Sequence, residues 1–182
     1  MKRSLGPKTL VYPLPAFLIG TYDHTGKANI MTLAWGGICC SDPPLLAISI
    51  RKERWTYKAV LANGCFTVSI PPVALAAETD FAELGLTPVK GEFVNAPYVQ
   101  ECPVVLELSL HSHLHLGSHV QFIGKIEDVK AEDSCLDEKG NLALVKVDPL
   151  IFDSGERQYF QAGDPKHKAF SSDKTFWKKN NK

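Results

Sequence analysis

The chain has 182 residues and a hydrophobic share of 45%, and its 20 basic side chains are matched by 20 acidic ones. This length and composition predict a single folded domain over residues 1–182, with a polar tail from about residue 174. Sequence-independent binding of nucleic acid requires an excess of positive charge. The formal net charge of this chain is zero, so we expect no nucleic-acid partner.

The chain contains no apolar run of the roughly 20 residues that would span a bilayer. The N-terminus is basic, but its short apolar stretch is interrupted by Pro13 and Pro15, unlike a secretory signal. We therefore expect a cytoplasmic protein with no membrane partner. The five cysteines lack C-x-x-C spacing, which favours reduced and mostly buried thiols over a metal or redox motif.

The first half of the chain predicts short strands and two helices, separated by Gly and Pro. Asp23 and Gly26 are typical of a hairpin turn, and Asp42-Pro43-Pro44 interrupts the chain further on. Gly64 is a suitable C-terminal stop for a helix. The expected strands are 16–23, 28–35, 45–50 and 65–70, and the expected helices are 51–64 and 73–86.

The second half of the chain predicts mostly strands. Residues 104–117 alternate in polarity, residues 119–131 form a second long strand, and residues 142–147 follow a turn and continue the strand pattern. Many strands with two short helices favour an antiparallel barrel over alternating βαβ units.

No dinucleotide-binding G-x-G-x-x-G, P-loop or G-x-S-x-G motif occurs, so a nucleotide cofactor needs another kind of site. One candidate is the segment that contains Asn29, Thr32 and Trp35. Gly36 and Gly37 follow it and would let a planar ligand approach the backbone. A hairpin whose Trp35 packs in the core remains an open alternative.

A second candidate lies where the expected strand 45–50 gives way to the expected helix. Free backbone N–H groups at a helix start, together with Arg51, Lys52, Arg54 and the Thr56 hydroxyl, would bind a phosphate. A solvated helix start with ordinary surface charge is equally consistent with the pattern.

Histidines supply two further candidates. His119 could donate to a ligand oxygen or tune a redox cofactor, although a single histidine is more often structural. His111, His113 and His115 alternate along an expected strand and therefore share one face, as two Zn²⁺ ligands would. A polar strand face and a metalloprotein are both open interpretations of these three residues.

Segments along the chain, in order, resemble the flavin reductase-like family of FMN-binding split barrels, and within it the flavoredoxins. In GSHVQFIGKI, Ser118 replaces the aspartate usual in the family. The resemblance runs from about Lys8 to Lys174. Its segments are the opening at 8–13, NIMTLAWGGICCSDPP (29–44), ISIRKERWTY (48–57), FTVSIP (66–71), LTPVKGEFVNAPYV (86–99) and GSHVQFIGKI (117–126).

The resemblance implies a mainly β fold, an antiparallel Greek-key split β-barrel with a few short helices. It implies a homodimer with FMN near the subunit interface. It places the isoalloxazine beside Thr32, Leu33, Ala34 and Trp35, and the phosphate beside Ser49, Ile50, Arg51, Arg54 and Thr56. It also suggests Asn29, Lys90, His119 and Phe152 as further residues near the flavin.

These observations predict an FMN-binding flavoprotein that acts in electron transfer or flavin-dependent reduction, with a redox protein or NAD(P)H as electron donor. An NAD(P)H:flavin oxidoreductase, in which FMN is a substrate that leaves, is the alternative within the family. A non-catalytic binding module and a metalloprotein built on His111, His113 and His115 are alternatives from other classes.

Overall fold

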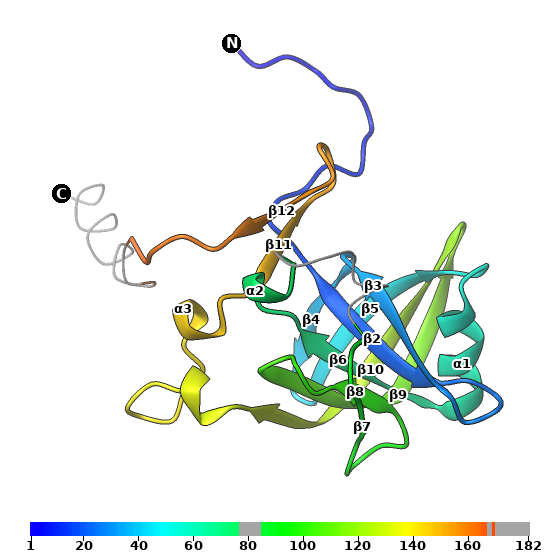
Figure 1. Ribbon diagram of the computed structural model, residues 1–182. Helices are drawn as coiled ribbons and strands as arrows, with labels where there is room; N and C mark the ends of the chain where they lie inside the picture. The colour runs from blue at the N-terminus through cyan, green and yellow to red at the C-terminus, as the bar shows by residue number, and fades with distance from the viewer. Residues whose placement is uncertain (77–84, 167–168, 170–182) are drawn as a thin grey trace.

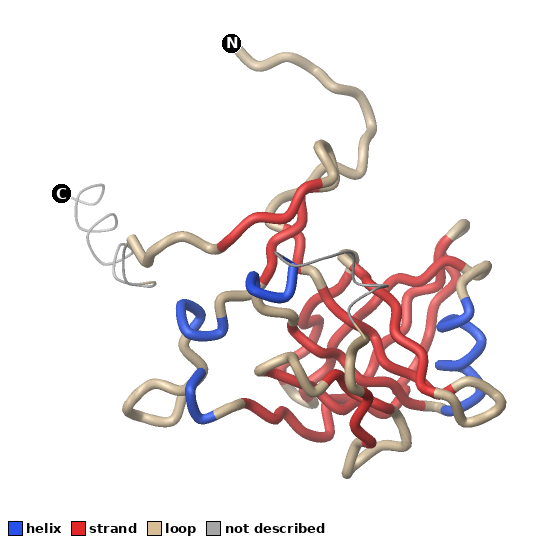
Figure 2. Tube along the Cα trace, viewed as in Figure 1, coloured by secondary structure: helices blue, strands red, loops and turns tan. Residues whose placement is uncertain are grey.

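The computed structural model describes residues 1–76, 85–166 and 169. Its main element is a seven-stranded antiparallel sheet in the order β3-β2-β6-β9-β10-β5-β4, which curls around the core (Figures 1 and 2). The strands are β2 (Phe17–Tyr22), β3 (Ala28–Leu33), β4 (Gly36–Ser41), β5 (Pro44–Arg51), β6 (Cys65–Ile70), β9 (Val104–Leu116) and β10 (His119–Ala131). The expected mainly β, antiparallel fold is confirmed.

The barrel core forms where the alternating apolar positions of these strands meet. Phe66 on β6 and Phe122 on β10 are both fully buried in it. Gly124 is required by this packing, because a Cβ there would lie 2.7 Å from Cζ of Phe66. Neighbouring strands thus fit closely, as protein interiors generally do.

Short elements connect or flank the barrel. Helix α1 (Trp55–Asn63) follows β5 and ends at Gly64, whose φ of 64° is the left-handed conformation that glycine tolerates best. The others are the helical turns α2 (Val73–Ala76) and α3 (Leu144–Val147), the 3-10 turn η1 (Asp133–Cys135), and the hairpin of β7 (Pro88–Lys90) and β8 (Pro97–Val99).

A second, three-stranded sheet extends from one end of the barrel, and we call it the arm (Figure 1). Its order is β1-β11-β12, from β1 (Leu14–Pro15), β11 (Leu150–Asp153) and β12 (Gln158–Gln161). All four residues of β12 are exposed. Within the described part of the chain, no helix is long and apolar enough to cross a membrane.

Most expected strands occur within one or two residues of their predicted bounds, and the 65–70 and 119–131 predictions match β6 and β10. The strand predicted at 142–147 is wrong, because α3 begins at Leu144 there. The amide of Val147 donates to the carbonyl of Ala143, which is a helical bond. A short apolar run does not by itself distinguish a helical turn from a strand.

Of the helix expected at 73–86, the structure describes residues 73–76, which form α2, and residues 85–86, which are not helical. Residues 77–84, and the tail expected from about residue 174, lie outside the described residues.

Candidate functional site

One hollow, of about 200 Å³, collects most of the residues that the sequence predicted for a cofactor site. It lies where β3 ends, β5 ends, α1 approaches and β10 begins. The residues that line it are Met31, Thr32, Leu33, Ala34, Trp35, Ser49, Ile50, Arg51, Arg54 and His119.

Antiparallel pairing brings these distant segments together. His119, the first residue of β10, pairs with Arg51, the last residue of β5. On the other side of β5, the amide of Ser49 donates to the carbonyl of Trp35 at 2.9 Å. Three rows of backbone therefore place an indole, a guanidinium and an imidazole around one hollow.

Trp35 and His119 form the aromatic wall of the hollow. Their ring centroids are 4.7 Å apart and the ring planes are tilted by 32°. Trp35 is 39% exposed, so it is not the core residue that the alternative interpretation of the hairpin required. The Ser118 hydroxyl lies 2.9 Å from Nδ1 of His119, and when it donates to Nδ1 the opposite ring nitrogen carries a proton that can be donated to a ligand.

The two glycines after Trp35 have different roles. A Cβ at Gly36 would lie 3.0 Å from the carbonyl oxygen of Ala47 and 3.2 Å from Phe17, so Gly36 is needed for strand packing. A Cβ at Gly37 would meet nothing within 4 Å. Only Gly37 therefore leaves open space beside the backbone.

The start of α1 is a cationic helix end without an internal cap. Arg54 is the N-cap residue, its side chain makes no capping hydrogen bond, and the first turn has no acidic residue. Arg51 and Arg54 are exposed and make no ion pair with any described residue. Free N–H groups and two guanidinium groups suit an anion such as a phosphate.

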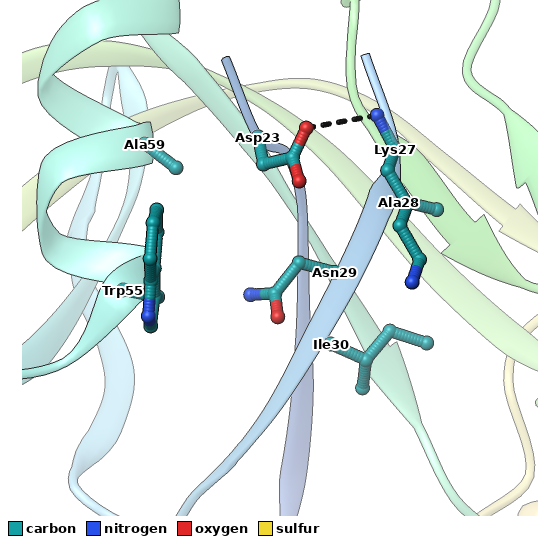
Figure 3. Close-up of a pocket in the computed structure, with 7 residues that line it drawn as sticks. All are labelled: Asp23, Lys27, Ala28, Asn29, Ile30, Trp55 and Ala59. Carbon is teal, nitrogen blue, oxygen red and sulfur yellow. Dashed lines mark hydrogen bonds between the residues drawn. The ribbon is translucent and has the colours of Figure 1, made fainter. Parts of the chain in front are cut away.

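Asn29 and Thr56 form a hydrogen bond at the start of α1, and neither residue lines the hollow. Thr56 is 1% exposed, and its hydroxyl oxygen accepts a hydrogen bond of 3.2 Å from the side-chain amide of Asn29. Asn29 lines a second pocket of about 330 Å³ between the β2–β3 hairpin and α1 (Figure 3). The Asn29–Thr56 hydrogen bond thus links a wall of this second pocket to the first turn of α1.

Four of the predicted residues do not line the hollow: Asn29 and Thr56, described above, and Lys90 and Phe152. Lys90 is exposed at the end of β7, and Phe152 lies in the arm, where its ring is 5.6 Å from that of Tyr159. Met31 does line the hollow, although the sequence argument did not select it. It is the residue immediately before Thr32 on β3, and proximity to that predicted segment was the signal available.

The three alternating histidines lie in the C-terminal half of β9. His111, His113 and His115 are all exposed, and the rings of His113 and His115 are 5.6 Å apart. Among residues 1–76, 85–166 and 169, no group of three or more His, Cys, Asp or Glu side chains is placed to hold a metal ion. The polar strand face is the interpretation that this arrangement favours.

The fold and this hollow agree with the comparison to known protein families. Residues 9–161 match the family described as "Flavin reductase like domain". The chain therefore belongs to the flavin reductase-like family, as the sequence motifs predicted.

Solved structures give closer relatives within this class. The flavoredoxin of Desulfovibrio vulgaris (Miyazaki F) is 48% identical, with a TM-score of 0.87, and the match covers 94% of this chain and 99% of that one. The flavoredoxin of Methanosarcina acetivorans is 26% identical, with a TM-score of 0.88, and the match covers 97% and 99% of the two chains.

A curated relative is similar over a large part of the chain and adds no activity. An uncharacterised protein of Aeropyrum pernix is 29% identical over 157 residues. The match covers 79% of this chain, which spans only 58% of that relative's length.

Proposed function

We propose that the chain is an FMN-binding flavoprotein that acts in electron transfer or flavin-dependent reduction. The observation that carries the proposal is the single hollow that joins an uncapped, doubly cationic helix end to an exposed aromatic wall. FMN has these two parts, a phosphate and a flat ring system, joined by a short ribityl chain. The donor set therefore fits the cofactor.

Each side chain has a separate part in holding the flavin. Arg51, Arg54 and the first N–H groups of α1 bind the phosphate, because charge-assisted hydrogen bonds favour a dianion there. Trp35 and the backbone of 32–34 contact the ring, and His119 lies beside it as a proton donor or acceptor. The bound flavin supplies one- or two-electron chemistry, and the protein orients it and tunes its potential.

The flavoredoxins of Desulfovibrio and Methanosarcina support this proposal by similarity over nearly the full chain. The electron donor is a redox protein or NAD(P)H. A hollow of about 200 Å³ is smaller than the roughly 300–1,000 Å³ typical of a ligand site, so a single chain covers little of the flavin. We propose that the chain works as a homodimer, whose second copy would cover the exposed side of the ligand.

The same openness favours a second candidate function, an NAD(P)H:flavin oxidoreductase from which FMN leaves as a substrate. The two candidates differ in retention of the flavin. A yellow protein that keeps its flavin through gel filtration supports the bound cofactor. Release of the flavin, with fast NADH oxidation only in excess free flavin, supports the oxidoreductase.

The phosphate site is tested by replacing Arg51 and Arg54 together with alanine. We expect FMN to bind at least tenfold more weakly, because each charge-assisted bond contributes about 1.5–3 kcal/mol. Riboflavin has no phosphate and should bind as it does to the wild type. Titration of both flavins, followed by quenching of their fluorescence, measures the two affinities.

The matched control is Lys58→Ala, because Lys58 is an exposed cation on α1 that does not line the hollow. It should leave both affinities unchanged. Equal weakening of FMN and riboflavin in the double variant would rule out the phosphate assignment.

A further inference from the structure

The pocket between the β2–β3 hairpin and α1 is larger than the hollow proposed for the flavin, at about 330 Å³. Figure 3 shows Trp55 and Ala59 on one side, Lys27 and Ile30 on the other, and Asp23 and Asn29 between them. Part of its lining is polar and part is a flat aromatic ring. The proposed binding of FMN makes no use of these walls.

Trp55 is the most informative residue of this pocket. It is 67% exposed, so it contributes little to the core. Ala59, one helical turn further on, carries only a methyl group (Figure 3). The ring of His24 lies nearly parallel to the indole, at 14°, with centroids 6.1 Å apart. An indole this exposed is a stacking surface for a planar heterocycle.

Asp23 supplies a fixed acceptor beside this surface. Its Oδ1 accepts hydrogen bonds from the amides of Thr25 and Lys27 and from the Thr25 hydroxyl. The Thr25 hydroxyl, followed by the Lys27 amide, lowers the pKa of the Asp23 carboxyl, which therefore remains ionised. No described residue donates to Oδ2. A carboxylate oxygen of this kind binds hydroxyl or amine groups and disfavours a phosphate inside the pocket.

The Trp55 pocket and the proposed phosphate site are connected through neighbouring residues of α1. Trp55 directly follows Arg54, and Asn29 of the pocket donates to Thr56 in the first turn of α1. A ligand whose phosphate lies at the start of α1 can therefore extend in two directions. One leads to the Trp35 hollow and the other to the Trp55 pocket.

We propose that the Trp55 pocket binds the adenosine half of an adenine dinucleotide. The adenine stacks on the Trp55 indole, the ribose hydroxyls donate to Oδ2 of Asp23, and the diphosphate lies at the start of α1. FAD and NAD(P)H share this half, and either is a source of it. The proposal shares the phosphate position with the proposed function but needs no bound flavin.

The test uses the full chain without flavin and titrates it with ADP-ribose in a calorimeter. We expect binding that Trp55→Ala weakens about tenfold or more, as loss of a base–aromatic stack typically does. Trp55→Phe keeps a flat ring and should retain most of the affinity. Leu61→Ala is the matched control, because Leu61 is exposed on α1 and lines neither pocket, and it should leave ADP-ribose binding unchanged.

The source of the adenosine is found by comparing each dinucleotide with its mononucleotide. If FAD is the ligand, it should bind more tightly than FMN, and Trp55→Ala should remove that advantage. If NADH is the ligand, it should reduce the flavin at lower concentration than reduced nicotinamide mononucleotide does, and the same variant should remove that difference.

Failure of this proposal and failure of the proposed function are distinguishable. If ADP-ribose binds in a Trp55-dependent way but FMN does not bind, the flavoprotein assignment is wrong and the adenosine site stands. If FMN binds but ADP-ribose does not, or if ADP-ribose binds equally to wild type and Trp55→Ala, the adenosine site is wrong. The adenosine site is also wrong if FAD binds no more tightly than FMN and NADH acts at no lower concentration than reduced nicotinamide mononucleotide.

Discussion

The barrel and the arm are built from similar β-forming residues, but they differ in what covers their side chains. On β6 of the barrel, the first five of six residues are buried, and Phe66 is fully enclosed. On β12 of the arm, every residue is exposed, and Phe160 retains 47% of its accessible surface. A hollow of about 520 Å³, lined almost entirely by apolar side chains, lies where the arm, α3 and the barrel meet.

This contrast indicates which part of the molecule is complete within one chain. The barrel encloses its own core, so it should supply most of the stability of the monomer. The arm presents apolar surface, and contiguous surface of this kind commonly marks a contact with another molecule. The proposed homodimer gives that surface a partner, in a two-fold arrangement where both copies use the same patch.

The largest effect is expected in the barrel core, from Phe66→Ala. Removal of a fully buried phenylalanine typically costs about 3–5 kcal/mol, because a cavity remains next to Gly124. The free energy of unfolding from urea titration measures it. A loss below about 1 kcal/mol would mean that the barrel core is not packed as described.

The next effect concerns a buried charge on β9, the central strand of the barrel sheet. Glu107 is fully buried and accepts hydrogen bonds from the amides of Glu92, Phe93 and Val94, at 2.8–3.2 Å. Lys130 is 3.2 Å from the same carboxylate. Burial by itself would raise the pKa of Glu107, but the three amides and Lys130 outweigh it and lower the pKa.

Glu107→Gln should therefore lower the free energy of unfolding by about 1.5–3 kcal/mol at pH 7. Because the folded pKa of Glu107 is lowered, its stabilisation is complete above its unfolded pKa of about 4.3 and is lost as the pH falls through the folded value. The wild type should thus lose stability more steeply below about pH 5 than the variant. The control is Glu138→Gln, an exposed residue, and parallel acid profiles for wild type and Glu107→Gln would contradict the assignment.

A smaller effect is expected at the mouth of the barrel, from Trp35→Ala. Loss of the indole should weaken FMN binding severalfold, since aromatic contacts contribute about 0.5–1.5 kcal/mol beyond buried area. The emission of the bound flavin should rise, because the indole no longer quenches it. Leu61→Ala is a matched control, with 37% exposure against 39% for Trp35. A sharp fall in melting temperature with unchanged flavin affinity and emission would make Trp35 a structural residue.

The sequence predicted the barrel better than the arm, for a physical reason. The strands β9 and β10 have 13 residues each, and the alternation of polar and apolar residues in the sequence of β9 is a strong signal. Strand β4 was not expected, because Gly36 and Gly37 at its start resemble a turn. The arm strands β11 and β12 have only four residues each, and β11 pairs with β1 across a long sequence separation, which local patterns do not encode.

The structure brings together those predicted site residues that are contiguous in the sequence, and their binding role stays a prediction. The 32–35 segment, the strand end at 49–51 and His119 all line the same hollow. Lys90 and Phe152 were selected by resemblance alone, and in one chain they lie elsewhere. The exposure of Trp55 was not foreseeable, because helical spacing does not reveal which face a short helix buries.

The smallest effect on the monomer is expected in the arm, from Phe160→Ala. Exposed substitutions usually change the free energy of unfolding by no more than about 0.5 kcal/mol, so the unfolding of a dilute sample should barely change. Self-association should respond, because a half-exposed ring that the second copy covers contributes apolar burial to the dimer. Light scattering over a concentration series should show a 20.0 kDa monomer at higher concentrations in the variant than in the wild type. Lys139→Ala, an exposed change on the η1–α3 loop, is the control. If the wild type is monomeric at micromolar concentration, or if Phe160→Ala leaves its dimer unchanged, the arm is not the surface that joins two copies.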